Sequence, residues 1–135
     1  MKKLSSLFIS FLAMGILVSV MSSVAASPEV TPRFDVTGIW KTGPYSYPFF
    51  QNDGEVKSIL VANNFGHYYS GEFISPTQFK GIMTRRQKSN GCITMIEITY
   101  TMTSNNTMTE EQLYLDSHCD LPQGKRINAS YTRVE

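Results

Sequence analysis

Few side chains in this chain have the chemistry of acid–base or metal catalysis, and they do not cluster in the sequence. The two histidines are His67 and His118. His67 and Glu72 are of the types that form an acid–base pair, but a strand points residues an odd number of positions apart to opposite faces. Without a bulge the two side chains would not meet. We therefore expect His67 to be a polar group on the surface or in the interior of the fold.

A short run near the end of the chain, Asp116-Ser117-His118-Cys119-Asp120, contains residue types that bind metals. A metal site needs ligands that converge from separate elements, and Cys119 has another partner in Cys92, the one other cysteine of the sequence. Cysteines usually pair in an oxidising, extracytoplasmic compartment. We expect a structural disulfide between Cys92 and Cys119, worth roughly 3–4 kcal/mol for the loop it closes, and no metal. A reactive thiol is the alternative, but it would need a base nearby.

Aromatic side chains are the remaining candidates, because the sequence has no Gly-x-Ser-x-Gly, His-Glu-x-x-His or phosphate-binding loop. We expect no catalytic residues and no cofactor. One short segment, interrupted by Pro44 and Pro48, carries four rings: Tyr45, Tyr47, Phe49 and Phe50. Since proline cannot donate to a strand ladder, we expect an edge strand or a loop here. With Tyr69, these rings are the predicted ligand contacts, as aromatic residues dominate pockets and binding hot spots; the alternative is that they seal the core.

The element best predicted by the sequence is a hairpin that runs from Cys92 to Cys119. From 92 to 102 the even positions are mostly apolar and the odd ones mostly polar, although Ile93 and Met95 break the pattern. This alternation is typical of a half-buried strand. Ser104-Asn105-Asn106 predicts the turn, and apolar and polar residues alternate again on the return.

The remaining sequence also predicts strands and no helix. Strands are expected over 34–41, 56–62, 65–74, 78–86 and 125–134, with turn signals between them. Seven to eight short strands at this spacing indicate an all-β antiparallel sandwich or barrel. The many aromatic residues favour a small closed or nearly closed barrel, because bulky side chains fill the interior of such a barrel.

The beginning of the chain indicates export. Residues 1–26 combine an initial Lys2-Lys3, an apolar stretch and the small residues Val24-Ala25-Ala26, which is the pattern of a secretory signal peptide. A membrane anchor is the alternative, but about 16 apolar-rich residues are short for a span. Residues 27–33 then form an N-terminal arm with two prolines, and residues 34–135 form one barrel domain. We expect a secreted or periplasmic protein with no membrane span after cleavage.

Charge excludes one class of partner. Without the two lysines of the signal peptide, the chain has ten basic and eleven acidic residues. A nearly neutral domain does not concentrate phosphate, so we expect no nucleic acid. The one basic cluster, Arg85-Arg86-Gln87-Lys88, is expected to be a solvated loop face, with an anionic partner as the alternative.

Gly38-Ile39-Trp40 resembles the Gly-x-Trp that opens the first strand of lipocalin and avidin-like barrels. The resemblance implies that Arg133, late in the barrel, stacks on Trp40, as a cation does on an aromatic ring. The length, the signal peptide, the tryptophan and the single disulfide are also similar to compact bacterial lipocalin-like inhibitors of secreted proteases. Those block their targets with an N-terminal arm, which here would be residues 27–33.

Three functions follow in order of preference. The first is a monomeric, non-catalytic protein that holds a small apolar or aromatic ligand at the mouth of the barrel. The second is an inhibitor of a secreted or periplasmic enzyme that acts through the arm and the loops. The third, an enzyme, is the least favoured.

Overall fold

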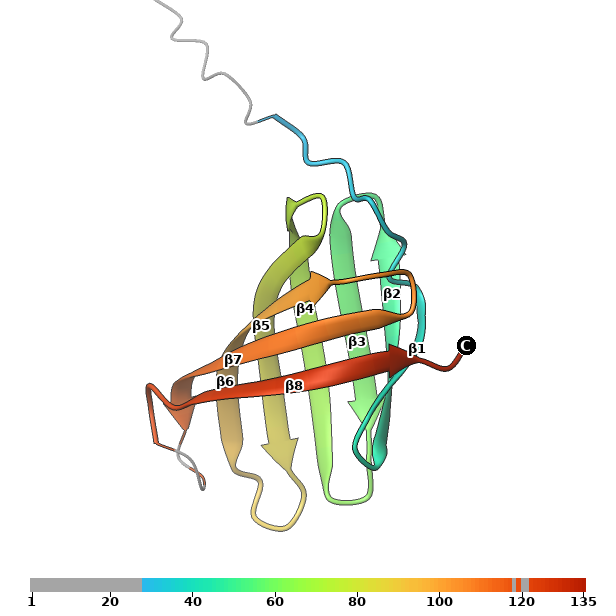
Figure 1. The fold of residues 1–135 in the computed structure, drawn as a ribbon. Helices are drawn as coiled ribbons and strands as arrows, with labels where there is room; N and C mark the ends of the chain where they lie inside the picture. Colours follow the sequence, from blue (N-terminus) through green and yellow to red (C-terminus); the bar gives the residue numbers. More distant parts are fainter. Residues whose placement is uncertain (1–27, 118, 120–121) are drawn as a thin grey trace, which may run out of the picture.

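The chain folds into a closed barrel of eight antiparallel strands (Figure 1). The computed structural model describes residues 28–117, 119 and 122–135. The strands are β1 (Gly38–Thr42), β2 (Tyr45–Asn52), β3 (Glu55–Val61), β4 (Phe65–Ser75), β5 (Gln78–Gln87), β6 (Ile93–Met102), β7 (Thr107–Ser117) and β8 (Arg126–Arg133). Each strand pairs with the next in sequence, and β8 pairs with β1 to close the sheet. The predicted all-β antiparallel barrel of seven to eight strands is therefore confirmed.

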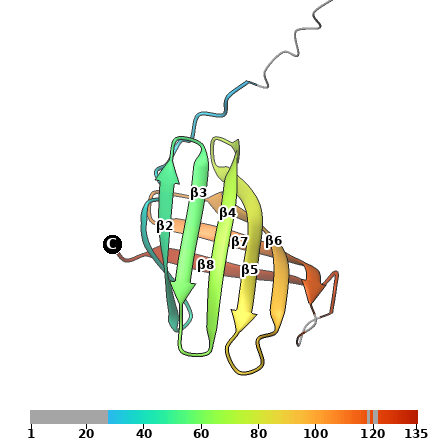
Figure 2. The same ribbon diagram turned by 180° about the vertical axis from the view of Figure 1, so that it is seen from behind.

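The barrel is flattened, with two walls and two ends. β2 to β5 run side by side along one wall, and β7 and β8 cross them steeply on the other (Figures 1 and 2). At the end that we call the arm end lie residues 28–37, the C-terminus and the turns β2–β3, β4–β5 and β6–β7. The opposite end, which we call the disulfide end, carries the connections β1–β2, β3–β4, β5–β6 and β7–β8.

Side-chain alternation builds the core. Every second residue of each strand points inward, and the inward faces are rich in large rings. Phe79 and Tyr100 stack with ring centroids 4.8 Å apart, and Phe49 lies edge-on to Tyr100 at 5.3 Å. The buried core consists of Val36, Trp40, Tyr47, Phe49, Val56, Tyr69, Phe73, Phe79, Met83, Ile96, Ile98, Tyr100, Met102, Met108, Tyr114 and Tyr131. The middle of the barrel is thus packed with side chains.

A glycine pair lets the wall bend between β4 and β5. Gly71 and Gly81 are direct partners in the ladder. A Cβ on Gly81 would lie 2.1 Å from the carbonyl oxygen of Ser70 and 2.4 Å from the Cα of Gly71. Only glycine fits this close backbone approach, which is the usual role of glycine where a barrel strand bends.

Trp40 and Arg133 close the arm end. Trp40 is 0% exposed, and its Nε1 donates a hydrogen bond to the carbonyl of Val36 at 2.8 Å. The guanidinium carbon of Arg133 lies 4.6 Å from the centre of the Trp40 ring. The stack that the resemblance implies is thus present in the structure. Such a contact contributes about 0.5–2 kcal/mol, depending on its desolvation.

The guanidinium of Arg133 also ties the segment before β1 and the β6–β7 turn to the end of β8. It donates hydrogen bonds to three backbone carbonyls, those of Thr37 at 2.6 Å, Asn105 at 2.8 Å, and Asp35. The backbone also explains the glycine of the Gly-x-Trp motif, because Gly38 has a φ of 143°, a value that other residues rarely adopt. A Cβ at this position would lie 2.4 Å from the carbonyl oxygen of Glu135.

The first strand is shorter than predicted. It begins at Gly38 and not at Phe34, because the preceding residues cross the arm end outside the ladder. The backbone N–H of Val36 donates to the side-chain oxygen of Gln51 at 2.9 Å, and Val36 is fully buried. Val30 and Phe34 also pack against the core. The predicted signal peptide, residues 1–26, lies outside the described residues, and so does Ser27 of the predicted arm.

The prediction of an edge strand or loop for the aromatic segment was wrong in part. The segment is strand β2, which pairs with β1 along Tyr45–Phe49 and with β3 along Phe49–Asn52. The pairing with β3 stops next to Pro48, which has no N–H to donate. Only the half from Tyr45 to Pro48 therefore lacks a partner on one side.

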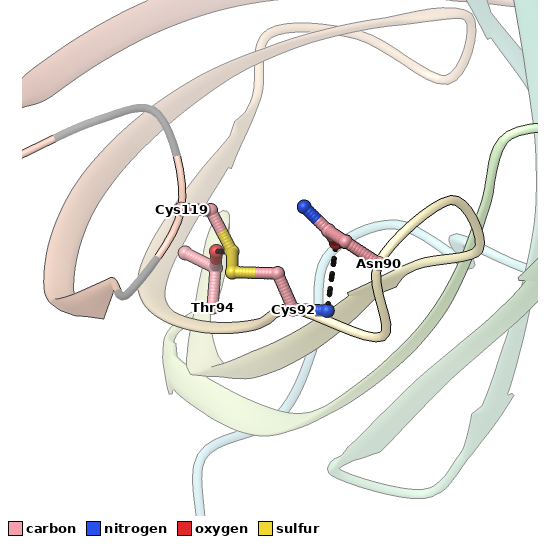
Figure 3. Close-up of a disulfide and its surroundings, with 4 residues drawn as sticks. All are labelled: Asn90, Cys92, Thr94 and Cys119. Atoms are coloured by element: carbon pink, nitrogen blue, oxygen red, sulfur yellow. Dashed lines mark hydrogen bonds between the residues drawn. A yellow bond between two sulfur atoms is a disulfide. The ribbon is translucent and has the colours of Figure 1, made fainter.

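A disulfide joins Cys92, in the β5–β6 connection, to Cys119, which follows β7 (Figure 3). Their Cα atoms are 5.8 Å apart. The backbone N–H of Cys92 donates to the side-chain oxygen of Asn90 at 2.9 Å, and the hydroxyl of Thr94 donates to the sulfur of Cys119 at 3.2 Å. A cysteine pair at bonding distance fits an oxidising compartment. Among the residues that the structure describes, none belongs to a helix long and apolar enough to span a membrane.

Candidate functional site: a pocket at the disulfide end

A pocket of about 390 Å³ opens at the disulfide end, opposite the end that Trp40 and Arg133 close. We call it the mouth pocket. It is lined by Tyr45, Tyr47, Asn64, Phe65, Arg85, Gln87 and Ser89. These residues come from β2, β4 and β5, from the β3–β4 connection and from the β5–β6 connection.

Other hollows lie on the surface of the protein. One of about 680 Å³ lies beside the arm, lined in part by Pro28, Glu29 and Val30, and one of about 420 Å³ lies over threonine and other polar residues of β6 to β8. We assign the candidate site to the mouth pocket because its lining includes Arg85, whose Nε is buried without a hydrogen-bond partner.

The walls of the mouth pocket are aromatic. The rings of Tyr45 and Phe65 meet edge to face with centroids 5.1 Å apart. The Tyr47 ring stacks on the imidazole of His67 at 4.9 Å and an interplanar angle of 19°. Alternation along β2 and β4 explains this grouping, because Tyr45 and Tyr47 are two positions apart, as are Phe65 and His67.

Three buried side-chain polar atoms in the described part of the chain have no hydrogen-bond partner: His67 Nδ1, Tyr69 Oη and Arg85 Nε. All three belong to inward-facing residues of β4 and β5, and His67 and Arg85 are direct partners in the ladder. Buried polar groups are nearly always paired, so an unpaired one needs an explanation. Of the three residues, Arg85 is the one that lines the mouth pocket.

Arg85 is the charged group of the pocket. Its guanidinium carbon lies 5.2 Å from the centre of the Phe65 ring. Among the described residues, no carboxylate forms an ion pair with it. The guanidinium therefore keeps its positive charge uncompensated beside the pocket.

His67 is a neutral imidazole at pH 7. It is 5% exposed, and burial, with a smaller contribution from the charge of Arg85, lowers its pKa from 6.5 to about 4. Its Nε2 lies 3.3 Å from the hydroxyl oxygen of Ser58. A neutral imidazole has one N–H donor and one acceptor nitrogen, so His67 can offer either to a ligand through Nδ1, depending on the tautomer.

A second polar layer lies deeper in the barrel, around Glu110. Glu110 is only 2% exposed and accepts hydrogen bonds from the Tyr131 hydroxyl at 2.7 Å and from the side-chain amide of Gln112. Burial and the charge of Glu110 raise the pKa values of Tyr131 and Tyr69 far above the usual value of a tyrosine. These two hydroxyls therefore stay neutral, and that of Tyr131 acts as a neutral donor to Glu110.

The structure brings one nucleophile-type pair together. Ser58 and His67 form a hydroxyl–imidazole pair, but such a nucleophile needs a third group that orients the imidazole. Here Nδ1 of His67 has no partner. Glu72 is exposed on the outer face, so the pair with His67 does not form, as the spacing predicted. The described residues contain no group of three or more potential metal ligands; His118 and Asp120 lie outside them.

The structure divides the predicted ligand contacts into three groups. Tyr45 and Tyr47 line the mouth pocket. Phe49 and Tyr69 are packed in the core beneath it, although the hydroxyl of Tyr69 is unpaired. Phe50 points to the outer face and is 57% exposed, so it does not join the others. The alternation of strand β2 separates Phe50 from its three neighbours.

Sequence reasoning missed Arg85 and Phe65 as pocket residues. Arg85 belongs to the basic cluster that was expected to be a solvated loop face, but β5 extends to Gln87. Phe79 and Met83 are buried in β5, and two more positions lead to Arg85 on the same face. Counting onward from these apolar positions is the signal that would have found it.

Comparisons with family models, with curated proteins and with solved structures found no match for this chain.

Proposed function

We propose that this protein is an exported, non-catalytic binding protein that holds a small aromatic or apolar ligand in the mouth pocket. The observation that carries the proposal is the combination of aromatic walls with the unpaired polar atoms of His67 and Arg85 at one end of a packed barrel. Ligand sites are mostly apolar hollows with a few polar groups that fix the ligand's orientation. The volume of about 390 Å³ suits a small molecule.

We further propose that the barrel is lipocalin-like. Its eight strands follow one another in sequence order around a closed sheet, and Arg133 stacks on the tryptophan of Gly38-Ile39-Trp40. Export is supported by the signal-peptide pattern of residues 1–26 and by the disulfide. In this proposal the protein is a monomer in the periplasm or outside the cell and needs no cofactor and no nucleic acid.

The test is a binding titration of the mature protein with phenylnaphthylamine, a neutral aromatic probe whose fluorescence rises in apolar surroundings. Replacing Tyr45 by serine removes one aromatic wall and should weaken binding several-fold. Phe50→Ser is the matched control, because Phe50 lies in the same strand but faces outward. Absence of probe binding, or equal effects of the two substitutions, would contradict the proposal.

A protein partner is the second candidate function, in the form of an enzyme inhibitor. It is favoured by exposed apolar side chains on neighbouring strands of the outer wall, including Ile59 and its ladder partner Tyr68. Val30 and Phe34 pack against the core, whereas Pro28 and Glu29 are exposed. Deleting residues 27–29 should abolish inhibition of a periplasmic or secreted protease if this candidate is correct.

A further inference from the structure

Two neighbouring arginines of β5 differ sharply in their surroundings. Arg86 is exposed on the outer face, where water solvates its charge. Arg85 lies on the inner face, and its Nε is buried without a partner. Burying a charged group is unfavourable unless it is paired. The sequence thus places a cation at the mouth pocket without the counter-charge that would stabilise it there.

The Arg85 side chain as a whole is half-buried, and Glu110, a charged side chain that is buried in the described barrel, does not supply its counter-charge. The hydrogen bonds of Glu110 come from Tyr131 and Gln112, and no ion pair links it to Arg85 among the described residues. The side chains that line the pocket with Arg85 are uncharged. The mouth pocket therefore has a net positive charge.

The position of Arg85 also suits an anion that enters from solvent. Its guanidinium stacks on the Phe65 ring, which fixes its plane. Its direct partner across the ladder is His67, whose ring stacks on Tyr47 and whose Nδ1 is buried without a partner. A guanidinium donates two parallel hydrogen bonds to a carboxylate or a similar oxyanion.

The filled core limits the length of the ligand. Beneath the mouth pocket lie the buried rings of Phe49, Tyr69 and Tyr100, which contact one another with centroids 5.3 to 6.4 Å apart. A long acyl chain would have to displace these rings. A compact ring system can instead lie against Tyr45 and Phe65 at the entrance.

We infer that the ligand of the mouth pocket is a compact aromatic acid whose anionic group is bound by Arg85 while its rings pack against Tyr45, Tyr47 and Phe65. This inference rests on the function proposed above and adds the chemical class of the ligand.

The test uses two probes that differ by one anionic group. Anilinonaphthalene sulfonate carries a sulfonate on the aromatic skeleton of phenylnaphthylamine. The mature protein should bind the sulfonate more tightly. Arg85→Gln should weaken binding of the sulfonate roughly 10- to 100-fold, which corresponds to the loss of a hydrogen-bonded charge contact, and should weaken binding of the neutral probe by a much smaller factor. Arg86→Gln, the matched control, should change neither.

The outcomes separate the two proposals. If both probes bind equally well and Arg85→Gln weakens neither selectively, the inference about the acid is wrong and the binding function stands. If neither probe binds, the function itself fails. Competition adds a test of size: naphthoate should displace the bound sulfonate, whereas palmitate at the same concentration should not. If palmitate displaces the sulfonate and naphthoate does not, the inference that the ligand is compact is wrong. The circular dichroism spectrum and melting temperature of Arg85→Gln show whether the variant is folded.

Discussion

The burial of His67 should make the stability of this protein depend on pH. In the folded protein the pKa of His67 is about 4, whereas its ordinary value is 6.5. Between these values the unfolded chain binds a proton at this residue and the folded chain does not. The contribution of this residue to the free energy of unfolding is therefore at its maximum above about pH 6.5. It falls as the pH drops toward about 4 and is constant below that.

The size of the effect follows from the same two values. The difference in pKa corresponds to roughly 3 kcal/mol of unfolding free energy. Burial is the main cause, and the charge of Arg85 adds to it. The other groups that face the imidazole are uncharged, namely Ser58 of β3, Tyr47 of β2 and Phe65 of β4. Removing the charge of Arg85 should therefore raise the pKa of His67 and reduce the pH effect.

The assay is urea unfolding followed by circular dichroism at a series of pH values between about 8 and 4. Carboxylates also titrate at the acidic end, so the informative quantity is the difference between the wild type and His67→Gln. That difference should change by roughly 3 kcal/mol over the series, and by less in an Arg85→Gln background. A difference that does not change with pH would refute the reasoning, and so would an NMR titration of His67 with a midpoint near its ordinary value.

Further predictions concern the frame of the barrel. Gly81→Ala should destabilise the protein by about 1–3 kcal/mol, because the added methyl overlaps backbone atoms; Gly54→Ala is the control, since nothing lies near its added methyl, and equal melting temperatures for the two would contradict the close packing. Replacing Cys92 and Cys119 together by serine should cost about 3–4 kcal/mol, measured by unfolding with and without reductant, and no effect of reductant on the wild type would argue against the bond. Arg133→Gln should cost about 1–3 kcal/mol through its lost carbonyl contacts and leave probe binding unchanged; a loss of binding would show that the two ends are coupled.

The sequence predicted the barrel because its signals are local. On β6 the alternating positions from Thr94 to Met102 are buried as expected, and the turn after it lies where the serine and asparagines predict. The return strand was harder to interpret. Its inward face carries Glu110 and Gln112, not the apolar Leu113 and Leu115. Polar residues face the core there because Tyr131 of β8 supplies a hydrogen bond, and no local pattern reveals a partner so distant in sequence.

The pocket was only partly predictable for a related reason. Aromatic density pointed to Tyr45 and Tyr47, and both line it. The charged member was hidden, because a run of basic residues usually indicates a solvated loop. The predicted strand over 78–86 already contained Arg85, and alternation from the buried Phe79 and Met83 turns it inward. What this strand's sequence does not contain is the pairing with β4 and β6 that continues past Arg85.

The two ends of the barrel use the same pair of groups for different purposes. At each end an arginine lies over an aromatic ring, 4.6 Å from Trp40 at the arm end and 5.2 Å from Phe65 at the disulfide end. Arg133 donates hydrogen bonds to three backbone carbonyls, which hold the segment before β1 and the β6–β7 turn against the end of β8. Arg85 has a buried Nε with no partner. Since a guanidinium forms its strongest hydrogen bonds with an anionic acceptor, the end at which the arginine has no acceptor among the described residues is the one at which binding an external anion is most favourable.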